Sequence, residues 1–191
     1  MGVLKEILNL LFGSDPELRR IIGVTLRMST LSTLISSLLG IPLGVIIGST
    51  EFKAKRLVNR VLHTLMGLPP VVAGLIVFLF LSRSGPLGTL KLLYSVTAMV
   101  IAQVVLITPI MTGLTANIVS VKAPLIHETA AGIGLKPRQR MVYIIYECRV
   151  QFISTVLTGF GRAISEVAAV QMVGGNDQFK TCVMTTAIMM Q

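Results

Sequence analysis

Residues 21–49 read IIGVTLRMSTLSTLISSLLGIPLGVIIGS, and this run decides the fold class. A helix needs about 20 consecutive apolar residues to cross the hydrocarbon core of a bilayer, and this run is longer than that. Its single charge, Arg27, lies near one end, where the stem of the side chain reaches toward the interface. The run therefore predicts a membrane-spanning helix, and its glycines at every fourth position favour close helix packing.

The rest of the chain has the same character, since 53% of the 191 residues are hydrophobic and only 13% are charged. Further apolar blocks predict spans at about 61–82, 92–116 and 151–173, in an all-α polytopic transmembrane bundle. The remaining ranges predict an N-terminal interfacial segment (1–20), a loop (117–150) and an outer segment (174–191). Within that outer segment, the apolar stretch 182–190 is too short to cross a bilayer, and we expect a final transmembrane helix to be missing from this chain.

The charge is strongly basic, with 17 Lys and Arg against 8 Asp and Glu. Nucleic-acid binding is one interpretation of such a balance, but these charges lie in short loops between apolar blocks, as the positive-inside rule expects. Nine cations fall on one predicted side and six on the other. We therefore expect loop 117–150 in the cytoplasm and the N-terminus outside. The nine are Lys53, Lys55, Arg56, Arg60, Lys122, Lys136, Arg138, Arg140 and Arg149.

The sequence offers no pattern for catalysis or metal binding. Cys148 and Cys182 are far apart, and His63 and His127 are isolated, so no Cys-His cluster has metal-ligand spacing. A Gly-x-x-x-x-Gly-Lys-[Ser/Thr] phosphate loop is also missing. We expect a protein that is not an enzyme and binds no cofactor.

The most informative loop is residues 122–138, KAPLIHETAAGIGLKPR. Pro124 suits the first turn of a helix, Gly132 and Gly134 suit its end, and Pro137 suits the start of the next. The pattern predicts a short helix across the membrane surface, flanked by basic residues. It is either an ordinary surface helix or a protruding segment to which a soluble partner binds.

Glu128-Thr129-Ala130, three residues, Gly134, nine residues and Ile144 resemble the EAA loop of binding-protein-dependent ABC importer permeases. The family usually has Leu-Pro after the isoleucine, where this chain has Tyr146-Glu147. The resemblance implies a coupling helix that docks on an ATPase subunit. Its residues here would be Glu128, Thr129, Ala130, Gly132 and Gly134.

Two further features lie inside predicted spans. Arg162 and Glu166 are four residues apart and should share a helix face, either neutralising each other or holding a translocation path or dimer interface in register. Pro69 and Pro70 predict a break or kink in the second span. Both segments resemble those of molybdate, tungstate and sulfate permeases, which implies that these four residues belong to the path or its gate.

The resemblance covers nearly the whole chain, and its outer motifs are most similar to tungstate permeases. It implies a type I importer permease in the inner membrane that pairs with a second copy. Its partners would be two ATP-binding subunits inside and an oxyanion-binding protein outside. Molybdate or sulfate remain alternative substrates.

Two other classes of protein, a membrane anchor for a soluble enzyme and half of an ion-driven transporter, agree less well with the sequence. The first needs no intramembrane charges, and the second normally has internal repeats and an acidic ion site.

Overall fold

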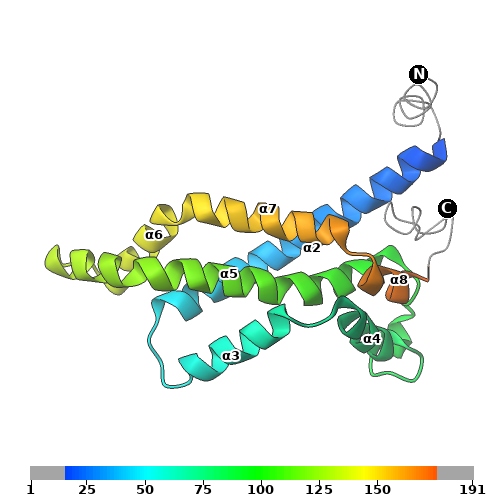
Figure 1. Ribbon diagram of the computed structural model, residues 1–191, viewed down its shortest axis with the longest axis horizontal. Coiled ribbons are helices and arrows are strands. Elements are labelled where there is room, and N and C mark those ends of the chain that lie inside the picture. Colours follow the sequence, from blue (N-terminus) through cyan, green and yellow to red (C-terminus); the bar gives the residue numbers. More distant parts are fainter. Residues whose placement is uncertain (1–15, 176–191) are drawn as a thin grey trace.

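A computed structural model describes residues 16–175, so most of the predicted interfacial segment 1–20 and outer segment 174–191 lies outside the described residues. Those described residues form helices and connections, without a β-strand. The helices are α2 (Pro16–Ser49), α3 (Lys55–Met66), α4 (Pro70–Leu81), α5 (Val96–Gly132), α6 (Pro137–Glu147), α7 (Arg149–Ser165) and α8 (Ala168–Gly174), with a short 3-10 turn η1 (Gly88–Leu90) before α5 (Figure 1).

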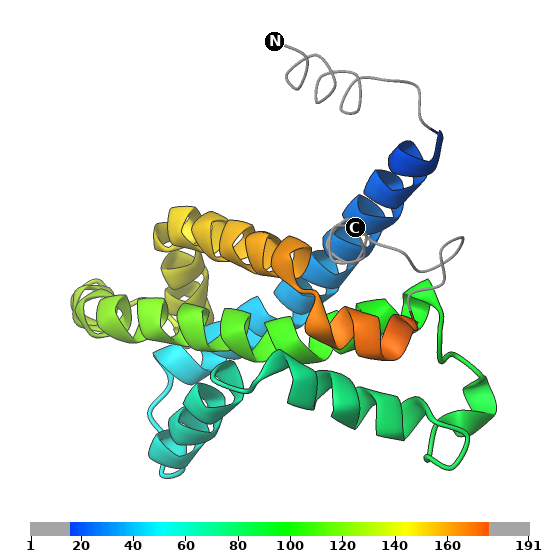
Figure 2. The same ribbon diagram turned by 45° about the vertical axis from the view of Figure 1, so that its right-hand side comes forward.

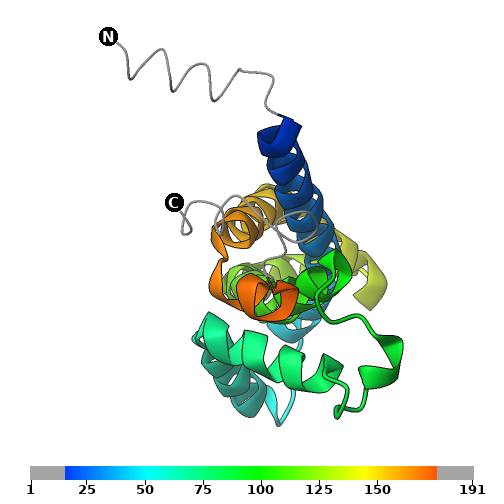
Figure 3. The same cartoon turned by 90° about the vertical axis from the view of Figure 1, so that its right-hand side faces the viewer.

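Helices α2 and α5 are the axis of the structure. Within them, Arg19–Ser49 and Val96–Ala130 are each long and apolar enough to cross a membrane. The two helices lie side by side along most of their length. Figure 3, seen from the α8 end, shows α2, α5 and α7 grouped together, with α3 and α4 to one side.

The contact between α2 and α5 depends on glycine. A Cβ added at Gly44 would lie 2.5 Å from the Thr115 Cβ and 2.7 Å from the Thr112 carbonyl oxygen. One turn on, a Cβ at Gly48 would lie 2.7 Å from the Ala116 carbonyl oxygen. Real Cβ atoms do not approach so closely, so the backbones meet only because these positions lack side chains.

The second predicted span is not one helix. Helices α3 and α4 meet at 96°, and the chain turns at Gly67, Leu68 and Pro69. Pro69 has an extended backbone (φ −59°, ψ 132°), and Pro70 is the first residue of α4. Proline lacks an N–H and pushes the preceding residue out of the helical region, so a proline pair ends one helix and starts another. The predicted kink is therefore a right-angle turn.

The fourth predicted span is interrupted as well. Helix α7 ends at Ser165, and α8 begins at Ala168 with its axis bent by 56°. Glu166 has an extended backbone (φ −76°, ψ 115°). The prediction that Arg162 and Glu166 share the face of one continuous helix is therefore wrong, although the two side chains remain near each other.

The predicted short surface helix is also not separate. Helix α5 continues through Pro124 to Gly132, so that the segment forms the end of a 37-residue helix. Val119, Ala123, Ile126 and Ala130 are all buried and follow one helix face on both sides of Pro124. This continuous packing outweighs the tendency of proline to end the helix. Pro137 does begin the next helix, α6.

Substitution at Gly44 tests the close contact of α2 and α5. We expect Gly44→Ala to lower the free energy of unfolding by about 1–3 kcal/mol, because the new methyl group overlaps Thr115. Gly23→Ala is the matched control in the same helix, since a Cβ there meets nothing within 4 Å. Thermal unfolding of the purified protein in detergent measures both, and equal stability of the two variants would contradict the packing argument.

Candidate functional site

The two breaks lie next to each other. Helices α4 and α8, which follow the breaks, pack together along their length (Figure 2). A Cβ at Gly74 would lie 2.8 Å from the Ala169 Cα, so these backbones also touch. Ala73 and Ala169 share a buried cluster with Met111 and Ala163. The predicted residues Pro69, Pro70, Arg162 and Glu166 thus all lie at or beside this paired break.

Glu166 is a buried carboxylate with two partners. Its side chain is 5% exposed, and Oε2 lies 3.7 Å from Nη2 of Arg162, which is 42% exposed. Its Oε1 accepts the N–H of Ala169 at 3.2 Å, in the first turn of α8. A buried charge is costly without a counter-charge and hydrogen bonds, and both are supplied here. The geometry agrees with mutual neutralisation of the pair, and it also fixes the direction in which α8 leaves the break.

Gln103 links the α7–α8 break to α2 and α5 by hydrogen bonds, and the sequence alone did not predict this role. Its side chain is fully buried on α5. Nε2 donates to the Ala163 carbonyl at 2.8 Å, and Oε1 accepts from Ser32 Oγ on α2 at 2.6 Å. In an unbroken helix, the N–H of Val167 would serve that carbonyl, but α7 ends before it. A lone glutamine within an apolar run was the available signal.

The second region is the end of α5 and its turn into α6, here called the α5 tip (residues 128–136). Glu128, Thr129 and Gly132 are exposed, whereas Ala130 is buried. Gly134 has φ +69°, a left-handed conformation that favours glycine. The N–H of Leu135 donates to the Ala130 carbonyl at 2.9 Å, which closes the helix end. The structure thus brings the five predicted coupling residues into one tip, but it turns Ala130 inward.

The α5 tip is attached to the rest of the bundle. A buried cluster at this end joins four helices, with Val45 from α2, Val119, Ala123 and Ile126 from α5, Ile144 from α6 and Phe152 from α7, and with Cys148 between α6 and α7. His127 Nε2 donates to the carbonyl of Ser49, the last residue of α2, at 3.2 Å. The end of α5 from which the tip projects is therefore packed against α2, α6 and α7.

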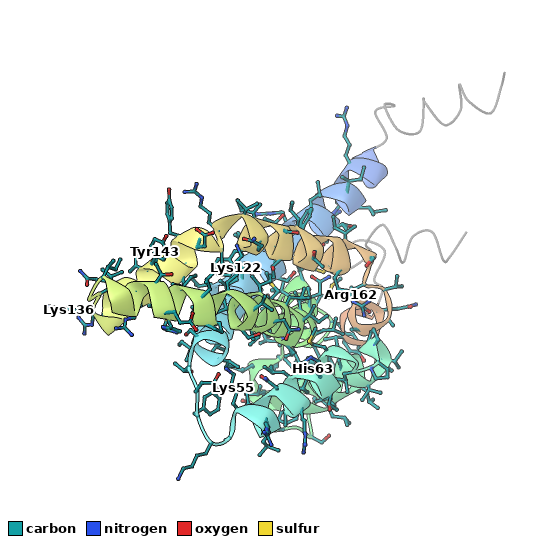
Figure 4. The ribbon with its side chains drawn as sticks, turned by 60° about the vertical axis from the view of Figure 1, so that its left-hand side comes forward. Lys55, His63, Lys122, Lys136, Tyr143 and Arg162 are labelled. Atoms are coloured by element: carbon teal, nitrogen blue, oxygen red, sulfur yellow. The ribbon has the colours of Figure 1, made fainter. Side chains whose placement is uncertain are left out.

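Basic side chains gather at the same end. Figure 4 shows Lys136 at the extremity, Tyr143 on α6 above it, and Arg162 toward the opposite end of the bundle. Arg149 lies over the Tyr146 ring, 4.2 Å from its centroid.

Burial raises the pKa of the Cys148 thiol, and the nearby Lys122 opposes that shift only in part. Within residues 16–175, no three His, Cys, Asp or Glu side chains come close enough to hold a metal ion.

Comparison with known proteins places these features in context. Residues 40–191 match the family described as the binding-protein-dependent transport system inner membrane component. The chain is 41% identical to the tungstate uptake system permease protein TupB of Peptoclostridium acidaminophilum, over 97% of this chain and 82% of that protein. It is 37% identical to a probable anion ABC transporter permease protein of Haloferax volcanii, over 88% and 75%. The TupB protein of Campylobacter jejuni is 35% identical, over 98% and 78%.

Replacement of Gln103 tests its role at the break. We expect Gln103→Leu, which keeps the size but not the hydrogen bonds, to destabilise the protein by about 1–3 kcal/mol, because the Ala163 carbonyl is left buried and unpaired. Gln171→Leu, at an exposed position on α8, should change stability little. Thermal unfolding in detergent distinguishes the two, and a Gln103→Leu variant as stable as the control would show that the amide is dispensable.

Proposed function

Because the chain belongs to the family of inner membrane components of binding-protein-dependent transport systems, we propose that it is the permease of an importer for a tetrahedral oxyanion, with tungstate as the first candidate. It is a multi-pass membrane protein and not an enzyme, and ATP hydrolysis belongs to a partner ATPase. A solute-binding protein is its other partner. We further propose that two copies of the chain pair, with one ATPase subunit for each.

The α5 tip is the observation that carries the proposal. It presents the exposed Glu128 and Thr129 at the end of a long helix, and it is closed by a glycine turn. In our proposal this tip docks on the ATPase. The His127–Ser49 hydrogen bond and the buried cluster beneath it then carry the motion of the ATPase into α2, α6 and α7.

The paired break is the proposed gate. Short helices joined by irregular backbone move more easily than long ones, and in membranes such breaks are tolerated where protein or water satisfies the freed groups. Here Gln103 and Glu166 satisfy backbone groups at the α7–α8 break, and Pro69 and Pro70 set the α3–α4 break. ATP binding would open the path outward so that the binding protein delivers its ligand, and hydrolysis would reset it inward.

The substrate follows from the relatives and from charge. Two of the similar proteins are named for tungstate uptake, and a third is named as a probable anion transporter. Molybdate and sulfate share the shape and charge of tungstate and are the alternatives. We propose that the binding protein makes the selection, because a tight cationic site in the permease would slow release.

The orientation rests on the positive-inside rule. Lys136, Arg138 and Arg140 lie at or just after the α5 tip, Lys53 lies in the turn between α2 and α3, and Lys55 and Arg56 begin α3. Figure 4 labels Lys136 and Lys55. We propose that this end faces the cytoplasm and that the start of α2 faces outward.

ATP-dependent tungstate uptake tests the proposal. Membrane vesicles would contain the full-length permease with its ATPase and binding protein. We expect Gly134→Arg to abolish uptake and reduce ATPase association at least about tenfold, because it places a bulky cation and a left-handed backbone strain at the docking tip.

Gly23→Ala, on α2 and outside the tip, is the control. A Cβ there meets nothing within 4 Å and lies in a regular helix, so uptake should be kept. If the ATPase still binds Gly134→Arg and uptake persists, the tip is only a surface helix end. If the unsubstituted complex transports molybdate or sulfate in preference to tungstate, the substrate assignment changes but the permease role stands.

A further inference from the structure

Helix α3 has an exposed polar face that begins at the basic end of the bundle. Arg56, Arg60, His63 and Thr64 follow helical spacing and are all exposed, and we call them the α3 polar row. None of the twelve residues of α3 is fully buried. The half-buried apolar residues Val58, Leu62 and Met66 follow another face of the helix, which packs on α5.

The contact of α3 with α5 indicates the depth of its last turn. The thioether of Met66 lies over Gly113 of α5. The neighbouring α5 residues Thr112 and Thr115 touch Gly44 of α2. At this level α2 still exposes the large apolar side chains Leu43 and Ile46, which suit lipid. The last turn of α3, with His63 and Thr64, therefore lies within the depth of the bilayer.

The charges in the row are not balanced by the protein. In the part of the chain that the structure describes, the ion pairs are Lys55–Glu51, Lys122–Glu147 and Arg162–Glu166, and none includes Arg56, Arg60 or His63. Arg56 lies at the basic end of the bundle, and Arg60 lies one turn before Thr64. Cations within a bilayer almost always face the protein interior or a water-filled cavity. The exposure of Arg60 so close to the last turn therefore indicates that water, and not lipid, meets this face.

The two arginines in the row suit an oxyanion. His63 Nδ1 donates to the Asn59 carbonyl at 2.7 Å, and Thr64 Oγ1 donates to the Arg60 carbonyl at 2.9 Å, so both of these hydrogens are already used within the helix. The guanidinium groups of Arg56 and Arg60 present planar forks of N–H donors, which match the oxygen atoms of a tetrahedral anion.

We propose that the α3 polar row lines a water-filled section of the translocation path on the basic side of the membrane and contacts the oxyanion as it leaves. This inference rests on the proposed importer function and adds a path surface to it. The row lies along one helix of which no residue is fully buried, which suits brief contact and release better than tight binding.

Thiol labelling tests the water-filled surface without relying on transport. Single cysteines replace Arg60 and His63 in the row, and Leu57 and Val61 on the exposed apolar stripe of the same helix. The background carries Cys148→Ser and Cys182→Ser, and the full complex is reconstituted in liposomes. We expect a charged, membrane-impermeant methanethiosulfonate to label positions 60 and 63 about tenfold faster than 57 and 61, since it reacts only from water. Equal rates at all four positions would overturn the proposal.

Uptake then tests contact with the anion. We expect Arg60→Gln to lower the maximal rate of tungstate uptake about fivefold and Arg60→Lys to restore part of it, with ATPase association unchanged. Lys91→Gln, an exposed cation beside η1 at the other end, is the control and should transport normally. Normal uptake by Arg60→Gln would remove the anion contact from the proposal.

The two proposals fail separately. If the unsubstituted complex takes up no oxyanion but positions 60 and 63 are still labelled fast, the importer assignment is wrong and the water-filled surface stands. If uptake is normal and the labelling rates are equal along the helix, only the α3 path is wrong.

Discussion

The need to satisfy every backbone polar group away from water governs this structure. A helix does so by itself, so each interruption must be served by something else. At the α7–α8 break, the amide of Gln103 takes the Ala163 carbonyl, and the carboxylate of Glu166 takes the Ala169 N–H. At the α3–α4 break, proline supplies no N–H to satisfy at position 70. Gln103 on α5 also accepts a hydrogen bond from Ser32 on α2, and it thereby links the α7–α8 break to both of these helices.

Helices α2 and α5, which support these breaks, pack closely because glycines at their contact lack side chains. Gly44 and Gly48 bring α2 against α5, and the buried hydroxyls of Ser32 and Ser36 reach Gln103 and Thr108 across the same contact. Between helices in lipid there is little hydrophobic gain, so close backbone contact and polar bridges provide the attraction. The glycine contact and the bridge to the break thus belong to one continuous interface.

Much of the architecture follows from the sequence, and the exceptions have physical causes. Long apolar runs and glycine spacing predict α2 and the presence of a helical membrane bundle. Pro69-Pro70 predicts the first break but not its right angle, because the direction depends on the packing of α4 on α8. Pro124 predicts the start of a separate short helix, and this prediction is wrong, since the buried face through Ala123 and Ile126 keeps α5 helical. The end of α7 at Ser165 cannot be predicted from composition alone, because the residues around it favour helix. The freed Ala163 carbonyl is satisfied by Gln103, which is far away in sequence. The five predicted coupling residues lie together at the end of α5, and their role stays a prediction, whereas the inward turn of Ala130 depends on the fold.

The unbroken length of α5 has a mechanical consequence. Its 37 residues form a rod of about 55 Å, with the tip at one end and Gln103 within the first turns of the other. Because α2 lies along most of this rod and touches its backbone at Gly44 and Gly48, a push at the tip would move both helices together. The far end, where Gln103 holds the α7–α8 break, would then follow the tip without a chain of side-chain rearrangements.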